Sequence, residues 1–340
     1  MRSNVRYQVG LIGSGSWATA LAKILTDNHF RLNWWIRKGE DLRFLQLRRC
    51  NPSYLSSVRF DLKHIVLSTD AARVIADSDW VIICIPSAFV REVIDPLPRN
   101  IFGDKSVISA IKGILPGVNL LLNDYLEREF GLPLDHYFSI TGPCHAEEVA
   151  AQKLTYVTFT GKNFQTARII ARRFITRYLK TVVNDDIWGA QYAAVLKNIY
   201  AIGAGICHSL GYGDNFLSVY IANCAGEMTA FIDEVNKRQN HVNLNRNPFA
   251  SAYLGDLMVT CYSQYSRNRN FGTMIGTGYS VRSAQLEMKM VAEGYYAARC
   301  IHQINETEKL PIPIAEAIYG ILYEGHGAGE AFGRMEKILY

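Results

Sequence analysis

The chain has 49% hydrophobic and 20% charged residues, which is typical of a globular protein. Its 340 residues are too many for one ordinary hydrophobic core, so we expect two domains. Its net charge of +5 comes from dispersed basic residues, which suits anionic small molecules and predicts no nucleic-acid partner. Because no uninterrupted apolar stretch approaches the length of a membrane span, we also expect no membrane insertion.

The seven cysteines form no Cys-x-x-Cys pair, and several lie within apolar runs. An odd number at such spacings predicts reduced thiols in a cytoplasmic protein. The histidines and cysteines show no zinc-site spacing, so we expect no metal. The first ten residues lack the apolar segment of a signal peptide.

The first motif is a glycine-rich loop between a short strand at 7–12 and a helix at about 19–27. It reads G-x-G-x-x-A, from Gly13 through Gly15, Ser16 and Trp17 to Ala18. Its first glycine permits a tight turn, its second lets a pyrophosphate approach the backbone, and the helix N-terminus faces the phosphates. The motif therefore predicts a dinucleotide site; the alternative is a glycine-rich turn without a ligand.

The next strand, at 31–36, is followed directly by Arg37 and Lys38, and the first acidic residue after it is Glu40. Folds that prefer NAD(H) usually place an acid here for the ribose, whereas two cations suit the 2′-phosphate of NADP(H). We therefore expect NADP(H) to be accepted, with NAD(H) not excluded. A solvated strand end is the other interpretation.

Further strands at 79–87, 106–111, 137–141, 154–160 and 179–183 alternate with helices. This pattern predicts a doubly wound, Rossmann-type α/β domain over residues 1–186. Ligands of such sheets bind beyond the carboxyl ends of the strands. Phe89, Lys112, Gly142 and Ala146 follow such ends, as the glycine loop does.

Residues 187–340 predict an all-helical domain, with helices around 187–208, 216–236, 254–261, 282–290, 293–304 and 313–323. Residues 238–249 are polar and predict a loop. The first of these helices is apolar nearly all round, which indicates a buried helix, yet it contains Lys197. Desolvation lowers the pKa of a lysine and lets it exchange protons near neutral pH. Alternatively, its stem crosses the core and its head reaches water.

Several motifs together resemble the bacterial type of NAD(P)-dependent glycerol-3-phosphate dehydrogenase, in order over almost the whole chain. The most specific are L-G-D-L-M-V-T-C (254–261) and S-R-N-R (266–269). The others are G-S-G-S-W-A-T-A-L-A (13–22), A-I-K-G-I (110–114), T-G-P-C-H-A-E-E-V-A (141–150), A-A-V-L-K-N-I-Y-A-I-G-A-G (193–205), L-G-Y-G-D-N (210–215), V-A-E-G (291–294) and P-I-P-I-A-E-A-I-Y-G-I-L-Y-E-G (311–325).

The resemblance implies reversible reduction of dihydroxyacetone phosphate to sn-glycerol 3-phosphate for glycerophospholipid synthesis, with Lys197 as the catalytic acid/base. The implied substrate residues are Lys112, Gly142, Cys144, Asp256, Ser266, Arg267 and Asn268, together with Lys197. The implied cofactor contacts are Ser16, Trp17, Arg37, Lys112, Ala146, Arg267, Val291 and Glu293. A homodimer is left open.

The chain departs from the family pattern at a few positions. Cys144 stands where Ser or Thr is usual, and a thiol is a weaker donor than a hydroxyl, which puts its side-chain contact with substrate in doubt. His145 replaces an aromatic residue, and Ala18 replaces the common third glycine. Residues 249–253 depart from the usual glycine- and alanine-rich approach to Asp256. None of these changes removes a charged residue that the reaction requires.

The chemistry is consistent with these residue types. A lysine in a dry pocket can stabilise the developing alkoxide and supply the proton. Asp256, which shares a helix face with Thr260, can hold that lysine, or it can cap a helix after Gly255. The guanidinium of Arg267 matches phosphate oxygens, and Asn268 adds neutral donors. The alternative for residues 266–270 is a solvated polar loop. Arg269 is expected either to be solvated or to screen the phosphate charge. Glu293 either forms a hydrogen bond with the cofactor or stabilises the N-terminus of its own helix by interacting with the helix dipole.

Two other functions compete. A related two-domain reductase of another small hydroxy compound would share the glycine loop and the buried lysine but need not carry S-R-N-R. An NAD(P)H-sensing regulator would not need Lys197, Asp256 and Arg267 together, so the presence of all three argues against this function.

Overall fold

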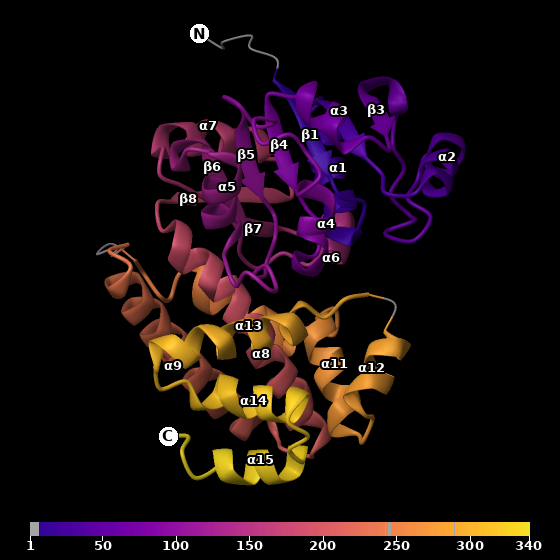
Figure 1. Ribbon diagram of the computed structural model, residues 1–340. Coiled ribbons are helices and arrows are strands. Elements are labelled where there is room, and N and C mark those ends of the chain that lie inside the picture. Colours follow the sequence, from indigo (N-terminus) through magenta and orange to yellow (C-terminus); the bar gives the residue numbers. More distant parts are fainter. Residues whose placement is uncertain (1–6, 242, 244–245, 289) are drawn as a thin grey trace. The chain divides into compact units, whose positions relative to one another are not determined.

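The computed structural model describes residues 7–241, 243, 246–288 and 290–340, which form two compact units (Figure 1). Of these described residues, the first unit comprises 7–85, 89–111 and 122–187, and the second comprises 86–88, 112–121 and those from 188 onward. Each unit has its own hydrophobic core. Among the described helices, none combines the length and the apolar character that a membrane crossing needs.

The first unit is built on one eight-stranded sheet in the order β3-β2-β1-β4-β5-β6-β7-β8. The first six strands give the Rossmann order, and ligands of such sheets bind where the order reverses, between β1 and β4. β6 and β7 pair antiparallel, whereas the other neighbours pair parallel. The strands are β1 (Gln8–Ile12), β2 (Arg31–Trp35), β3 (Ile65–Ser68), β4 (Trp80–Ile83), β5 (Ser106–Ser109), β6 (Tyr137–Thr141), β7 (Thr155–Gly161) and β8 (Leu179–Asn184).

The apolar strands are buried because helices cover the sheet, as expected for parallel strands. The helices of the first unit are α1 (Ser16–Asp27), α2 (Gly39–Arg48), α3 (Ala71–Ala76), α4 (Val90–Ile94), α5 (Leu122–Phe130), α6 (Ala146–Ala150) and α7 (Phe164–Phe174), with short 3-10 turns η1 (Leu62–His64) and η3 (Leu134–His136). The 3-10 turn η2 (Ser87–Phe89) begins in the second unit. The predicted Rossmann-type fold is confirmed. β3 was not predicted, because this four-residue strand at the sheet edge has a half-exposed pattern, with Val66 59% exposed.

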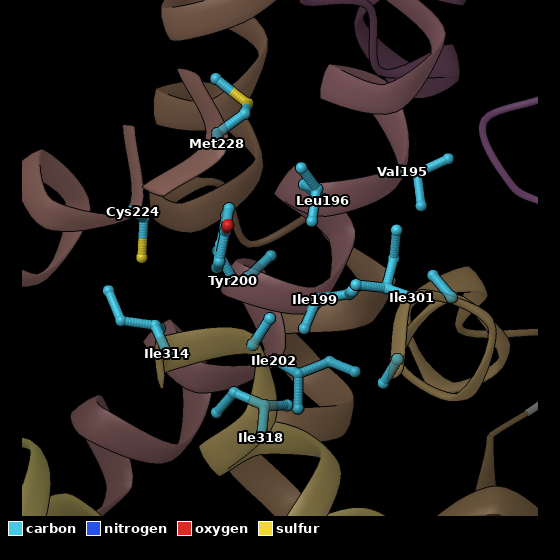
Figure 2. Packing of buried hydrophobic residues seen from close by; sticks show 14 of the residues in the cluster. Val195, Leu196, Ile199, Tyr200, Ile202, Cys224, Met228, Ile301, Ile314 and Ile318 are labelled. Atoms are coloured by element: carbon cyan, nitrogen blue, oxygen red, sulfur yellow. The ribbon is translucent and has the colours of Figure 1, made fainter. Parts of the chain in front are cut away.

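The second unit is helical and is organised around α8 (Ile187–Ser209), whose residues 189–207 are all buried. Figure 2 shows side chains of α8, such as Ile199 and Tyr200, among residues of α9, α13 and α14. The predicted burial of this helix is therefore confirmed. Its partners are α9 (Asp214–Arg238), η4 (Ser251–Gly255), α10 (Asp256–Tyr262), α11 (Arg267–Gly276), α12 (Val281–Glu287), α13 (Glu293–Glu308), α14 (Pro313–Tyr323) and α15 (Ala328–Met335).

The helical predictions agree with this arrangement apart from their ends and two omissions. The helix predicted at 282–290 ends at Glu287, and Lys289 lies outside the described residues, as do positions 242, 244 and 245 of the predicted loop. α11 was not predicted as a helix because S-R-N-R-N is polar, and α15 because glycines flank and interrupt it. In α11 the Ser266 side chain caps the helix by accepting from the amide of Arg269.

Candidate active site

The glycine loop of the first unit has the geometry that a pyrophosphate requires. Gly13 has φ +133°, and a Cβ there would lie 2.1 Å from the carbonyl oxygen of Cys84, so only glycine fits. A Cβ on Gly15 would meet no described atom within 4 Å, which leaves that side accessible. Gly15 is also the N-cap of α1 and provides no side chain to cover the first amides of this twelve-residue helix. These residues fit a dinucleotide phosphate at the start of α1.

The two other predicted residues of this loop differ in their surroundings. Ser16, the first residue of α1, is buried. Trp17 is half-buried, and its indole Nε1 has no hydrogen-bond partner among the described residues. A buried indole donor normally has an acceptor, so Trp17 fits a site where a ligand completes its contacts.

The two cations after β2 are not equivalent. Arg37 is exposed, and its guanidinium carbon lies 5.8 Å from the centroid of the Phe89 ring. Lys38 is the N-cap of α2, and its Nζ lies 3.5 Å from Glu40 Oε1 on the surface. Because the charge of Lys38 is partly offset, Arg37 is the better candidate for reading a 2′-phosphate, with Phe89 beside it.

The residues after β6 also lie in the first unit. The Cys144 thiol donates to the carbonyl of Gly142 at 3.1 Å. Ala146 begins α6 and is buried, so its side chain packs in the core of that unit. Cys144 thus orders its own turn, and Ala146 can meet a ligand mainly through its backbone.

The second unit brings two lysines onto one buried carboxylate. Lys197 Nζ of α8 donates to Asp256 Oδ1 and, at 3.0 Å, to Thr260 Oγ1. Lys112 Nζ lies 3.3 Å from Asp256 Oδ2. The side chain of Asp256 is 1% exposed, that of Lys197 5% and that of Lys112 18%. Lys197 is therefore not a snorkelling lysine, since its ammonium lies within a buried polar cluster.

The electrostatics of this cluster favour the ionised carboxylate. Burial raises the pKa of Asp256, but the ammonium groups of Lys112 and Lys197 outweigh burial and hold this pKa below its ordinary value. Two cations on one carboxylate leave a net charge of about +1, which favours an anionic substrate. Asp256 is the first residue of α10 while Gly255 occupies the N-cap position, and the Asp256 carboxylate binds Lys112 and Lys197, so the capping interpretation is wrong.

A chain of amides positions Lys112 and α11 against α8. Asn198 Nδ2 donates to the carbonyl of Lys112 at 2.9 Å, and Asn198 Oδ1 accepts from Asn268 Nδ2 at 2.8 Å. Asn268 Oδ1 in turn accepts from the amide of Gly294 at 2.9 Å. Asn268 is therefore engaged within the protein, and Asn198, which sequence reasoning did not assign to the site, is its partner.

The polar segment expected as either a loop or a phosphate site is the start of α11. Arg267 is its first residue and is half-buried, whereas Ser266 is buried and caps the helix. The Nε of Arg269 is buried and has no hydrogen-bond partner among the described residues, so this side chain is not simply solvated. The segment thus combines a guanidinium with the N-terminus of a ten-residue helix, an arrangement that binds phosphates.

Glu293 begins α13 and binds Ser87, which is 206 positions away in sequence. Its carboxylate accepts from the Ser87 amide at 2.9 Å and from the Ser87 hydroxyl at 2.5 Å. Burial raises the pKa of Glu293, although these hydrogen bonds oppose the shift. No sequence signal identifies this pair. Nearby, Val291 lines a pocket of about 160 Å³ with Phe271, Met288 and Tyr295.

Two family models together match most of the chain. The NAD-dependent glycerol-3-phosphate dehydrogenase N-terminus matches residues 8–167, and the C-terminus of the same family matches 186–332. The chain belongs to the NAD-dependent glycerol-3-phosphate dehydrogenase family. Among the described residues of this family member, no cluster of three His, Cys, Asp or Glu could hold a metal ion.

Named relatives agree with the family. The chain is 32% identical to an NAD(P)+ glycerol-3-phosphate dehydrogenase from Halalkalibacterium halodurans, covering 97% of this chain and 94% of that one. It is also 32% identical to a protein of the same name from Bacillus anthracis, covering 96% and 95%. The crystal structure of glycerol-3-phosphate dehydrogenase from Coxiella burnetii superposes with a TM-score of 0.87 at 26% identity, covering 97% and 98%. A 2-dehydropantoate 2-reductase from Geobacter metallireducens shares only the fold, with a TM-score of 0.57 and 14% identity over 94% of this chain and all of that one.

Proposed function

We propose that Lys197 is the acid/base of a reversible reduction of dihydroxyacetone phosphate to sn-glycerol 3-phosphate. The chain is an NAD(P)-dependent glycerol-3-phosphate dehydrogenase, an oxidoreductase that uses NAD(H) or NADP(H). The observation that carries the role of Lys197 is its buried ammonium, held by Asp256 and Thr260 in the helical unit.

The chemistry divides between cofactor and protein. When bound, the nicotinamide supplies a hydride to the ketone carbon. Lys197 polarises the ketone oxygen and transfers a proton to it, and the same residue takes the proton back in oxidation. Asp256 keeps the ammonium charged and oriented, because its carboxylate is ionised beside two lysines.

The substrate's phosphate is assigned to Arg267 and the N-terminus of α11, with Ser266 and Asn268 shaping that helix start. Lys112 adds a second cation beside Asp256. We assign Gly142 and Cys144 to substrate through their backbone, since the thiol already donates to Gly142.

We assign residues to the cofactor in each unit by itself. In the first unit these residues are Gly13, Gly15, Ser16, Trp17, Arg37, Lys38, Phe89 and Ala146. In the second they are Lys112, Arg267, Val291 and Glu293. We propose that Glu293 acts mainly by fixing Ser87 beside the cofactor, because its carboxylate already accepts two hydrogen bonds from that residue.

The test is spectrophotometric. We expect NADH or NADPH oxidation with dihydroxyacetone phosphate, and we expect Lys197→Ala to lose nearly all turnover while still binding the cofactor. Lys337→Ala, which removes an exposed lysine, is the matched control and should retain activity. Turnover by Lys197→Ala near the wild-type rate would disprove its role. No turnover by a folded wild-type protein that binds both cofactors would disprove the substrate assignment.

Two further proposals concern the location and the assembly of the protein. We propose a cytoplasmic enzyme because all seven cysteines are free thiols.

We propose a homodimer because Val219, Met258 and Tyr262 of α9 and α10 are apolar and each more than 40% exposed. Light scattering, which measures the mass of the protein in solution, tests this proposal.

A further inference from the structure

The segment 149–184 has a charge unlike that of the rest of the chain. It holds seven of the 36 Lys and Arg and none of the 31 Asp and Glu, so it carries +7 while the remainder carries −2. The dispersion of basic residues expected from the sequence therefore has one exception. This segment forms β7, α7 and β8, with β8 at the edge of the sheet and α7 packed on β7 and β8 (Figure 1).

These cations are directed to solvent and lack acidic partners. Six are exposed and Arg173 is half-buried. No described acidic residue lies within salt-bridge distance of any of them, in contrast to pairs such as Lys23–Asp27 on α1. Arg168 contacts an aromatic ring instead, with its guanidinium 5.8 Å from the centroid of Phe164. The positive charge of this surface is thus uncompensated within the described chain.

Apolar side chains alternate with the arginines of α7. Phe164 is 40% exposed, Ile169 46% and Ile175 43%, although large apolar side chains are usually buried. Arg168 and Arg172 share one side of the helix, one turn apart. The buried face of α7, made of Ala167, Ile170, Ala171 and Phe174, already packs in the core, so the exposed apolar residues form a separate outer surface.

A groove of about 470 Å³ runs along this surface between α7 and β8. Ala171, Ile175 and Val183 give it an apolar lining, and Arg168 and Arg172 also line it. Apolar walls next to two guanidinium groups match a molecule with a phosphate beside a hydrocarbon chain.

We propose that the α7 surface, defined as Phe164, Arg168, Ile169, Arg172 and Ile175, docks on a bilayer containing anionic phospholipid. Basic residues interleaved with apolar ones are typical of a helix lying in the membrane interface. A nucleic-acid surface is disfavoured because two of the three apolar residues are aliphatic, and bases stack on aromatic rings. The arginines bind lipid phosphates, and the apolar side chains enter the headgroup layer.

The experiment is flotation of the full-length protein with vesicles of phosphatidylcholine, with or without phosphatidylglycerol. We expect binding only with phosphatidylglycerol and weaker binding in high salt. A cation near an anionic membrane contributes roughly a fivefold gain in affinity, so Arg168→Gln with Arg172→Gln should weaken binding about 25-fold. Ile169→Asn should also weaken binding while leaving the charge unchanged.

The matched control removes two exposed arginines from α2, Arg43→Gln with Arg48→Gln, on a helix that also carries Glu40 and Asp41. This pair should retain vesicle binding. Unchanged thermal unfolding and dehydrogenase activity of the α7 variants would exclude misfolding as the cause of lost binding. Failure to bind anionic vesicles, equal losses in the α7 and α2 pairs, or preferential binding to single-stranded RNA would each overturn the proposal.

Discussion

Replacing Asp256 with Asn tests how far this carboxylate stabilises the helical unit. The change is nearly isosteric, but it removes the counter-charge of two lysines. Lys112 is 18% exposed and can turn toward water, whereas Lys197 is 5% exposed and cannot do so without repacking α8. Leaving a buried charge unpaired costs about 3–5 kcal/mol, and we expect a loss of this size in the free energy of unfolding.

The reverse change should cost less. In Lys197→Met the carboxylate keeps the ammonium of Lys112, 3.3 Å away, so we expect a loss of about 1–3 kcal/mol. Urea denaturation of both variants at neutral pH gives the comparison. Because the folded-state pKa of Asp256 lies below its ordinary value, its stabilisation is present above the unfolded-state pKa of about 3.9. That stabilisation is lost as pH falls through the folded-state pKa, so wild type and Asp256→Asn should converge in acid. A cost below about 1 kcal/mol for Asp256→Asn, or a greater cost for Lys197→Met, would refute the reasoning.

Three further predictions concern other sites. Burial raises the pKa of Glu227 to about 7, so the folded state keeps a proton that the unfolded state releases near pH 4.5. The free energy of unfolding should therefore fall by roughly 3 kcal/mol as pH rises toward 7. Glu227→Gln should remove this dependence of the free energy of unfolding on pH, as measured by denaturation at several pH values. Arg37→Ala should raise the Kd for NADPH more than that for NADH, measured by fluorescence titration, and equal losses would mean that Arg37 does not contact the 2′-phosphate. Gly272→Ala would place a Cβ 1.9 Å from the carbonyl oxygen of Ile202, so it should destabilise the protein by about 1–3 kcal/mol. Because α11 would have to shift, the same change should raise KM for dihydroxyacetone phosphate. An unchanged KM would show that α11 does not position the substrate.

The sequence predicted those parts whose signals are local. The glycine loop, the apolar strands and the buried helix α8 follow from short motifs and periodicity, and all three are present. The short edge strand β3 and the polar helix α11 were missed because their patterns resemble loops. A capping serine followed by a turn of polar residues gives no apolar periodicity, so only the Ser266 cap would have indicated α11.

Contacts between distant residues were harder to predict. The spacing of Asp256 and Thr260 indicated a shared helix face, but no local pattern could show that Lys112, 144 positions away, joins the same carboxylate. The pair Ser87–Glu293 and the link from Asn198 to Asn268 are likewise products of packing. Polar side chains far apart in sequence carry no periodic signal, so only the fold shows that they meet.

The contact of α8 with α11 fixes the distance between the backbones of these two helices. At their closest approach Gly272 meets the backbone of Ile202, and Gly205 meets that of Arg269, with no side chain between them. Lys197 lies five residues before Ile202 on α8, and Arg267 lies five residues before Gly272 on α11. The spacing of the Lys197 and Arg267 main chains is thus set by direct backbone contact, so under the proposed roles only their side chains can adjust to the length of a substrate.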